Sequence, residues 1–223
     1  SATQVLSYNT AVGYQALVGS PTSSANTGMY NTAIGHQSMT VNTSGSYNST
    51  LGVNTLLNNT IGQYNVAIGY GALFTNVAKN ASVAIGYEAM RYADNTVTSS
   101  TSGNIAIGYQ ALRGSTTASS NTGTNNVAMG YLAMYGNTSG YDNVSIGTYA
   151  GYSNTIGGQN VAIGRDSLRS NVARSNNVAV GYGAMYYASN TTSGTLSYNT
   201  ALGAYALKGV LHLQIIQGHI TQL

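Results

Sequence analysis

A nine-residue phrase recurs along most of the chain and is typified by NVAIGYGAL at residues 65–73. Its central glycine stands at eleven positions: Gly13, Gly35, Gly52, Gly69, Gly86, Gly108, Gly130, Gly147, Gly164, Gly181 and Gly203. Successive glycines lie 22, 17, 17, 17, 22, 22, 17, 17, 17 and 22 residues apart, so a five-copy block of 95 residues occurs twice. Such a short, regular period is typical of solenoids, in which each repeat packs against its neighbours. We call each repeat a coil.

The residues before the glycine form a predicted β-strand. The residue two places before the glycine is small in every copy. The residue three places before the glycine is β-branched in every copy except Ser49. Larger and smaller side chains therefore alternate with period two. A large aliphatic residue directly precedes every glycine, and we expect this pre-glycine column to be the core. Its members are Val12, Ile34, Leu51, Ile68, Ile85, Ile107, Met129, Ile146, Ile163, Val180 and Leu202.

The second half of each phrase ends in Leu or Met, four residues after the glycine, in every copy except at Gly151. A helix is disfavoured, because each glycine costs up to about 1 kcal/mol of helix propensity. The pattern therefore predicts an all-β fold: a parallel β-solenoid (β-roll) of about eleven 17- or 22-residue rungs. Residues 1–209 form a single solenoid domain in this prediction. With strands about 4.8 Å apart, the rod is roughly 50 Å long.

Asparagine precedes the strand in every coil except that of Ser82. A second asparagine follows the glycine by seven residues in the 17-residue coils, as at Asn42 and Asn59. Stacked amides can donate and accept along the axis, which predicts hydrogen-bonded ladders; the alternative is that asparagine serves only as a turn residue. The strand-side ladder comprises Asn9, Asn31, Asn48, Asn65, Asn104, Asn126, Asn143, Asn160, Asn177 and Asn199.

The composition argues against several classes of function. Only 5% of residues are charged, the net charge is +3 without basic runs, and cysteine is absent. We therefore expect no nucleic-acid binding and no thiolate metal site. No apolar run reaches the roughly 18 residues of a membrane span, so membrane insertion is not expected. The extra residues of the 22-residue coils predict loops at one edge of the rod, where recognition sites are common.

No catalytic or metal-binding group is indicated. The acidic residues Glu88, Asp94, Asp142 and Asp166 are scattered, and His36 occupies a position that is tyrosine in other coils. No spacing fits a zinc site, and no nucleophile has an evident base. We expect a protein that is not an enzyme and needs no cofactor.

A tyrosine column follows the glycine. If its rings face outward, they form a possible glycan-contact ladder, because aromatic faces suit sugar rings; the alternative is that they pack between rungs or between chains. The column comprises Tyr14, Tyr70, Tyr87, Tyr109, Tyr131 and Tyr182.

The phrases NTAVGYQAL at residues 9–17 and NIAIGYQAL at 104–112 carry a family resemblance. The chain resembles the repeats of phage tail-fibre proteins and the heads of trimeric autotransporter adhesins (YadA-like) over residues 1–209. This resemblance implies a left-handed parallel β-roll in which three chains associate side by side along a fibre axis.

The final residues, 210–223, depart from the repeat. Reading their codons one nucleotide later permits STSANNTGxYNTA, which, with one residue in front for the damaged codon, lines up with residues 20–33 and with residues 115–128. We therefore expect a frameshifted twelfth rung after Gly209; the alternative is a genuine strand that caps the rod or docks on a neighbour.

Together these features predict a structural or adhesive segment of an extracellular or virion fibre, such as a tail fibre or surface adhesin, that mediates attachment to a host or surface. The expected partners are further copies of the chain, as a homotrimer or an end-to-end filament, and a cell-surface glycan. Alternatives are a self-assembling surface filament and a stand-alone glycan- or ice-binding solenoid.

Overall fold

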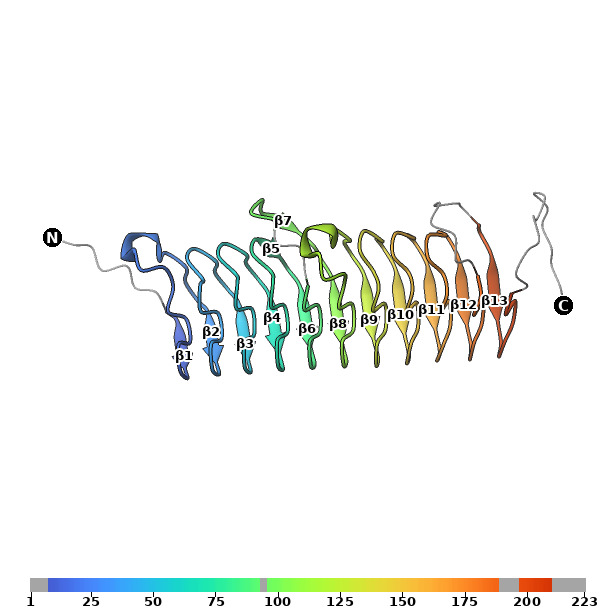
Figure 1. The fold of residues 1–223 in the computed structure, drawn as a ribbon, viewed down its shortest axis with the longest axis horizontal. Coiled ribbons are helices and arrows are strands. Elements are labelled where there is room, and N and C mark those ends of the chain that lie inside the picture. The colour runs from blue at the N-terminus through green and yellow to red at the C-terminus, as the bar shows by residue number, and fades with distance from the viewer. Residues whose placement is uncertain (1–7, 93–95, 189–196, 210–223) are drawn as a thin grey trace.

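The computed structural model describes residues 8–92, 96–188 and 197–209. One parallel sheet of eleven strands runs along the molecule, with successive coils side by side (Figure 1). Its strands are β1 (Thr10–Val12), β2 (Thr32–Ile34), β3 (Ser49–Leu51), β4 (Val66–Ile68), β6 (Val83–Ile85), β8 (Ile105–Ile107), β9 (Val127–Met129), β10 (Val144–Ile146), β11 (Val161–Ile163), β12 (Val178–Val180) and β13 (Thr200–Leu202). The predicted parallel β-solenoid is confirmed.

Equivalent residues lie directly beside one another in this sheet. Ile68 pairs with Ile85, and Ile85 pairs with Ile107, although the intervening chain lengths differ. The extra residues of the long coils therefore leave the strand register unchanged. Where two long coils are adjacent, a second sheet pairs β5 (Lys79–Asn80) with β7 (Ser100–Thr101).

The coil turns through left-handed backbone at its central glycine. Gly69 has a φ of 115°, and a Cβ built on it would lie 2.6 Å from the carbonyl oxygen of Gly86. Glycine is required here for two reasons, because a side chain would strain the backbone and would also collide with the next coil. The amide of Gly69 donates to the Leu51 carbonyl oxygen at 2.9 Å, which ties each bend to the previous coil.

The interior of the solenoid is narrower than the sequence pattern suggested. The middle residue of the strand points inward, and Ala67, Ala84 and Ala106 are fully buried. The Leu or Met four residues after the glycine joins this core, as at Leu73 and Met134.

The prediction that the pre-glycine column is the core of the coil is wrong. Within the single chain Val12 is 57% exposed, Leu51 50% and Leu202 79%, and Met129, Ile146 and Ile163 are each 37% exposed. The other members are half-buried: Ile34, Ile68, Ile85, Ile107 and Val180. Alternate strand residues point to opposite faces, so an inward alanine places the large residues on both sides of it on the outer face.

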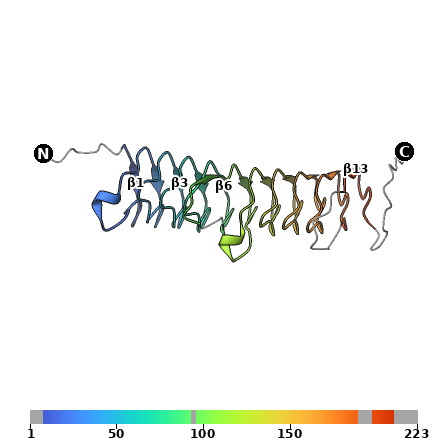
Figure 2. The same cartoon turned by 90° about the horizontal axis from the view of Figure 1, so that it is seen from above.

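Long coils carry short 3-10 turns, η1 (Ser23–Ala25) and η2 (Ala118–Ser120), which project from the same side of the stack (Figure 2). In the described part of the chain, no helix has the length and apolar character to cross a membrane. The predicted frameshifted tail, 210–223, lies outside the described residues.

Candidate functional site

The outer face of the eleven-stranded sheet is the largest candidate site. The pre-glycine column and the β-branched column two residues before it both point out of the coil, and we call these two columns together the apolar stripe. The stripe follows all the strands of the eleven-stranded sheet, and it contains aliphatic residues, Met129, Thr and Ser. Monomeric proteins rarely leave such long apolar surfaces in contact with water, so the stripe is a candidate interaction face.

The inner edge of the sheet is fixed by the strand-side asparagines. The amide nitrogen of Asn143 donates to Oδ1 of Asn126 at 3.0 Å and to the Gly157 carbonyl oxygen at 2.8 Å. Oδ1 of Asn143 accepts in turn from the backbone and side chain of Asn160. The same arrangement runs through Asn31, Asn48 and Asn65, so these predicted residues form hydrogen-bonded ladders that hold the stripe straight.

The second asparagine column is also hydrogen-bonded along the axis. Asn59 donates to Asn42 and Asn76 donates to Asn59, at 2.8 and 2.9 Å. A matching set runs through Asn137, Asn154 and Asn171.

The tyrosine column that follows the glycine forms a stack of rings. Tyr70, Tyr87, Tyr109 and Tyr131 succeed one another with centroids 5.1–5.2 Å apart and interplanar angles of 7–13°. Because each ring covers the face of the next, the exposed parts are ring edges and hydroxyls. The flat stacking of sugars on these faces that the sequence suggested is therefore available only at the ends of the stack.

The other two predicted tyrosines lie outside this stack. Tyr14 stacks on His36 with centroids 5.2 Å apart, and Tyr182 meets the ring of Tyr205 edge-on at 4.9 Å.

A second aromatic stack was not found from the sequence. Tyr8, Tyr30, Tyr47 and Tyr64 lie five residues before their glycines, with centroids 5.0 Å apart and interplanar angles of 1–12°. The recurrence of tyrosine at this position in the first four coils was the available signal. These side chains are half-exposed and line the first part of the rod.

Three tyrosines have perturbed acidity. The Glu88 carboxylate is the main cause of a raised pKa at Tyr87, because it opposes the phenolate charge. Partial burial raises the pKa of Tyr131, and a hydrogen bond to Tyr182 is the main cause of the raised pKa of Tyr205.

The two most buried carboxylates are already paired with arginines. Glu88 lies 3.1 Å from Arg91 and 3.2 Å from Arg113, and Asp166 lies 2.9 Å from Arg169. Arg113 also lies over the Tyr92 ring at 4.5 Å. These carboxylates are neutralised in structural clusters, which does not favour a role in acid or base catalysis. Among the described residues, no group of three His, Cys, Asp or Glu side chains could hold a metal ion.

Neither protein-family models, nor curated proteins, nor solved structures give a match to this chain. Its function must therefore be argued from the geometry of these surfaces.

Proposed function

We propose that this chain is a structural and adhesive fibre segment whose copies associate side by side through the apolar stripe. The stripe is the observation that carries this proposal. It presents half-exposed aliphatic side chains, such as Ile85 and Ile107, at the regular spacing of the strands. A second copy of the same chain offers the same spacing along its whole length, so the contact can repeat at every rung.

We infer an assembly of three chains from the resemblance to tail-fibre and trimeric adhesin repeats. Three sheets that meet around a common axis would cover the stripe of every copy with the stripes of its neighbours. The burial of apolar surface stabilises by about 25 cal/mol per Å², so eleven rungs contribute additively. The outward loops and the tyrosine edges would remain at the surface, where an attached fibre meets a host glycan.

Fibre stiffness is consistent with the contacts inside one chain. Each coil is joined to the next by backbone hydrogen bonds and by asparagine amides, so bending the rod would stretch both at once. Such a rod can hold a recognition surface away from a virion or a cell, and we place the protein in an extracellular, cell-surface or virion fibre.

The test is the mass of the protein in solution, measured by light scattering after size-exclusion chromatography. The double variant Ile146→Asp/Ile163→Asp puts two carboxylates into the stripe. The control is Val97→Asp, because Val97 is apolar and 77% exposed but lies on a long loop. We expect three chains for the parent protein and for Val97→Asp, and one chain for the double variant.

Two results would contradict this proposal. A single chain for the parent protein at micromolar concentration would favour a stand-alone binder, and an open-ended series of sizes that the double variant retains would favour end-to-end filaments.

A further inference from the structure

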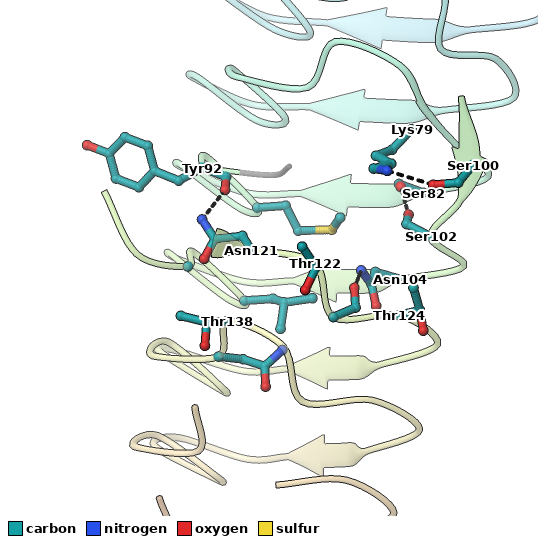
Figure 3. Close-up of a pocket in the computed structure, with 15 residues that line it drawn as sticks. Lys79, Ser82, Tyr92, Ser100, Ser102, Asn104, Asn121, Thr122, Thr124 and Thr138 are labelled. Atoms are coloured by element: carbon teal, nitrogen blue, oxygen red, sulfur yellow. Dashed lines mark hydrogen bonds between the residues drawn. The ribbon is translucent and has the colours of Figure 1, made fainter. Parts of the chain in front are cut away.

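A cavity of about 190 Å³ lies at the seam where two 22-residue coils follow each other. Figure 3 shows the residues that line it, among them Lys79 of β5, Ser100 of β7, and Asn121, Thr122 and Thr124. Ser82, Ser102, Thr122, Thr124 and Thr138 supply hydroxyl groups to the lining. Met90 and Leu112, which belong to the buried Leu or Met column, supply apolar surface.

The strand-side asparagine ladder is broken at this seam. Ser82 stands where the other coils have asparagine, and its hydroxyl bonds to the hydroxyl of Ser102. Asn104 is the next member of the ladder. Its side-chain nitrogen donates to the Gly123 carbonyl oxygen at 2.8 Å, whereas the equivalent nitrogen of Asn126 has two acceptors, Oδ1 of Asn104 and the Gly140 carbonyl oxygen.

Asn104 therefore keeps an N–H group without an acceptor among the described residues, although the residue is only 6% exposed. A buried donor without a partner is destabilising, because it has lost its hydrogen bonds to water. The cavity beside it is the place from which an acceptor can come.

The second asparagine ladder also restarts here. Asn137 is 4% exposed, and its side-chain nitrogen makes one bond, to the Gly140 carbonyl oxygen at 3.2 Å. The following member, Asn154, donates both to Asn137 and to the Gly157 carbonyl oxygen. Two buried amides that line one cavity thus lack the acceptor that their counterparts find in a preceding asparagine.

The charge of the lining selects among ligand classes. It contains no carboxylate, and its one cation, Lys79, donates to Ser100 at 2.6 Å. Amide donors and hydroxyls beside apolar side chains suit a ring that carries hydroxyl groups on one side and C–H groups on the other. The volume is below the roughly 300–1,000 Å³ of sites for drug-sized ligands, so it fits one ring and not an oligosaccharide.

We propose that this cavity binds a single neutral sugar residue, either free or at the end of a glycan. Sugar oxygens accept from Asn104 and Asn137, and the hydroxyl groups of the lining complete the contacts. This site is separate from the tyrosine stacks and from the apolar stripe, and it does not depend on the association of three chains. The spacing of 22 followed by 22 residues falls at the boundary of the two 95-residue blocks, and the residue one block after Ser82 is Asn177, so the missing ladder member belongs to the first block alone.

The experiment measures sugar binding by saturation-transfer NMR on the full chain. The probes are D-glucose, D-galactose, D-mannose and N-acetyl-D-glucosamine at up to about 50 mM, a range chosen for millimolar dissociation constants. Each sugar is compared with its methyl glycoside. A glycoside that binds as well as the free sugar indicates the end of a glycan, and binding that methylation abolishes indicates a free sugar.

Two variants test the location. Ser82→Asn restores the missing ladder member. Its side-chain oxygen would accept from Asn104, and its side chain would occupy part of the cavity. We therefore expect the affinity for the sugar to fall at least about tenfold, because one uncharged hydrogen bond and the space for the ligand are lost together. Thr138→Val removes one lining hydroxyl, and we expect binding to weaken about fivefold.

Thr155→Val is the matched control. Thr138 donates to the Thr155 carbonyl oxygen and Thr155 to the Val172 carbonyl oxygen, both at 3.0 Å, but only Thr138 lines the cavity. Each variant therefore loses one equivalent hydrogen bond from a threonine hydroxyl to a backbone carbonyl oxygen. Equal binding by Thr138→Val and Thr155→Val, or no saturable binding of any probe to the parent chain, would overturn the proposal.

Discussion

Oδ1 of Asn31 accepts two hydrogen bonds from Asn48, one from its backbone N–H at 3.0 Å and one from its side-chain nitrogen at 3.1 Å. One side chain thus fixes both the backbone and the amide of the residue seventeen positions later. The relationship repeats along each unbroken stretch of the ladder, and it makes the position of each coil depend on the one before it.

Replacement of a ladder member should therefore be costly. Asn143→Ala removes the Oδ1 that accepts from the backbone N–H and the side chain of Asn160, and both bonds that the Asn143 side-chain amide donates. We expect the free energy of unfolding, measured in urea, to fall by about 2–4 kcal/mol, because buried donors remain without partners. The control is Asn58→Ala, since the Asn58 side chain makes no hydrogen bond to the described residues, and it should change this free energy by less than about 0.5 kcal/mol. Similar losses for the two variants would contradict the ladder's role.

The central glycines should differ in their tolerance of alanine. Gly69→Ala strains the backbone and collides with Gly86, whereas Gly203, with a φ of 120°, has no described atom within 4 Å of its added Cβ. We expect Gly203→Ala to cost about 1–3 kcal/mol from backbone strain alone, and Gly69→Ala to cost about 1–3 kcal/mol more from the collision. Urea unfolding of both variants gives the difference directly, and equal costs would exclude the collision.

The inward alanines and the outward aliphatic residues should respond differently to substitution. Ala106→Ile overfills a buried site and should cost about 1–3 kcal/mol at any protein concentration. Ile163→Thr changes a residue of the apolar stripe, so its cost should grow with protein concentration as association comes to contribute to stability. Thermal unfolding over a hundredfold range of concentration separates the two effects. A concentration-independent loss for Ile163→Thr would place its role within the single chain.

The acidity of Tyr87 should depend on Glu88. Glu88→Gln removes the main cause of the raised pKa, so the pKa of Tyr87 should move down toward its ordinary value of about 10. A ¹³C NMR titration of labelled tyrosine measures this shift, and Asp142→Asn is the control because Asp142 is not among the groups that raise the pKa of Tyr87. A pKa that stays unchanged in Glu88→Gln would assign the shift to burial.

The same shift has a consequence for stability. Because the pKa of Tyr87 is higher in the folded than in the unfolded chain, its contribution is complete below the unfolded pKa of about 10 and is lost as the pH rises through the folded pKa. The free energy of unfolding should therefore decline above about pH 10, and less steeply in Glu88→Gln.

The repeat predicted the fold, because the recurrence of Ile68, Ile85 and their equivalents every 17 or 22 residues leaves few ways to bury each coil. It did not predict which strand face is inside. Alternation marks two faces but does not assign them, and the larger residues at Ile85 and Ile107 favoured the wrong choice. Only the narrow diameter of the coil, which holds small residues such as Ala84, Thr50 and Ser145 at the inward position, decides the question.

The cavity at the seam between the two long coils could not be predicted from the sequence pattern either. The substitution of Ser82 for asparagine was visible, but its effect depends on where the following long coil places residues 121–124. Likewise, tyrosine spacing alone did not show that the rings of Tyr87 and Tyr109 cover each other.

The in-register pairing of equivalent residues has a genetic consequence. A deletion or duplication of one whole coil joins two surfaces that already match, such as those of β3 and β4, so the chain can change length in steps of about 4.8 Å without designing a new contact. Recombination between similar coding segments would supply such steps, and the length of the molecule would then change by whole coils while its surface chemistry stayed the same.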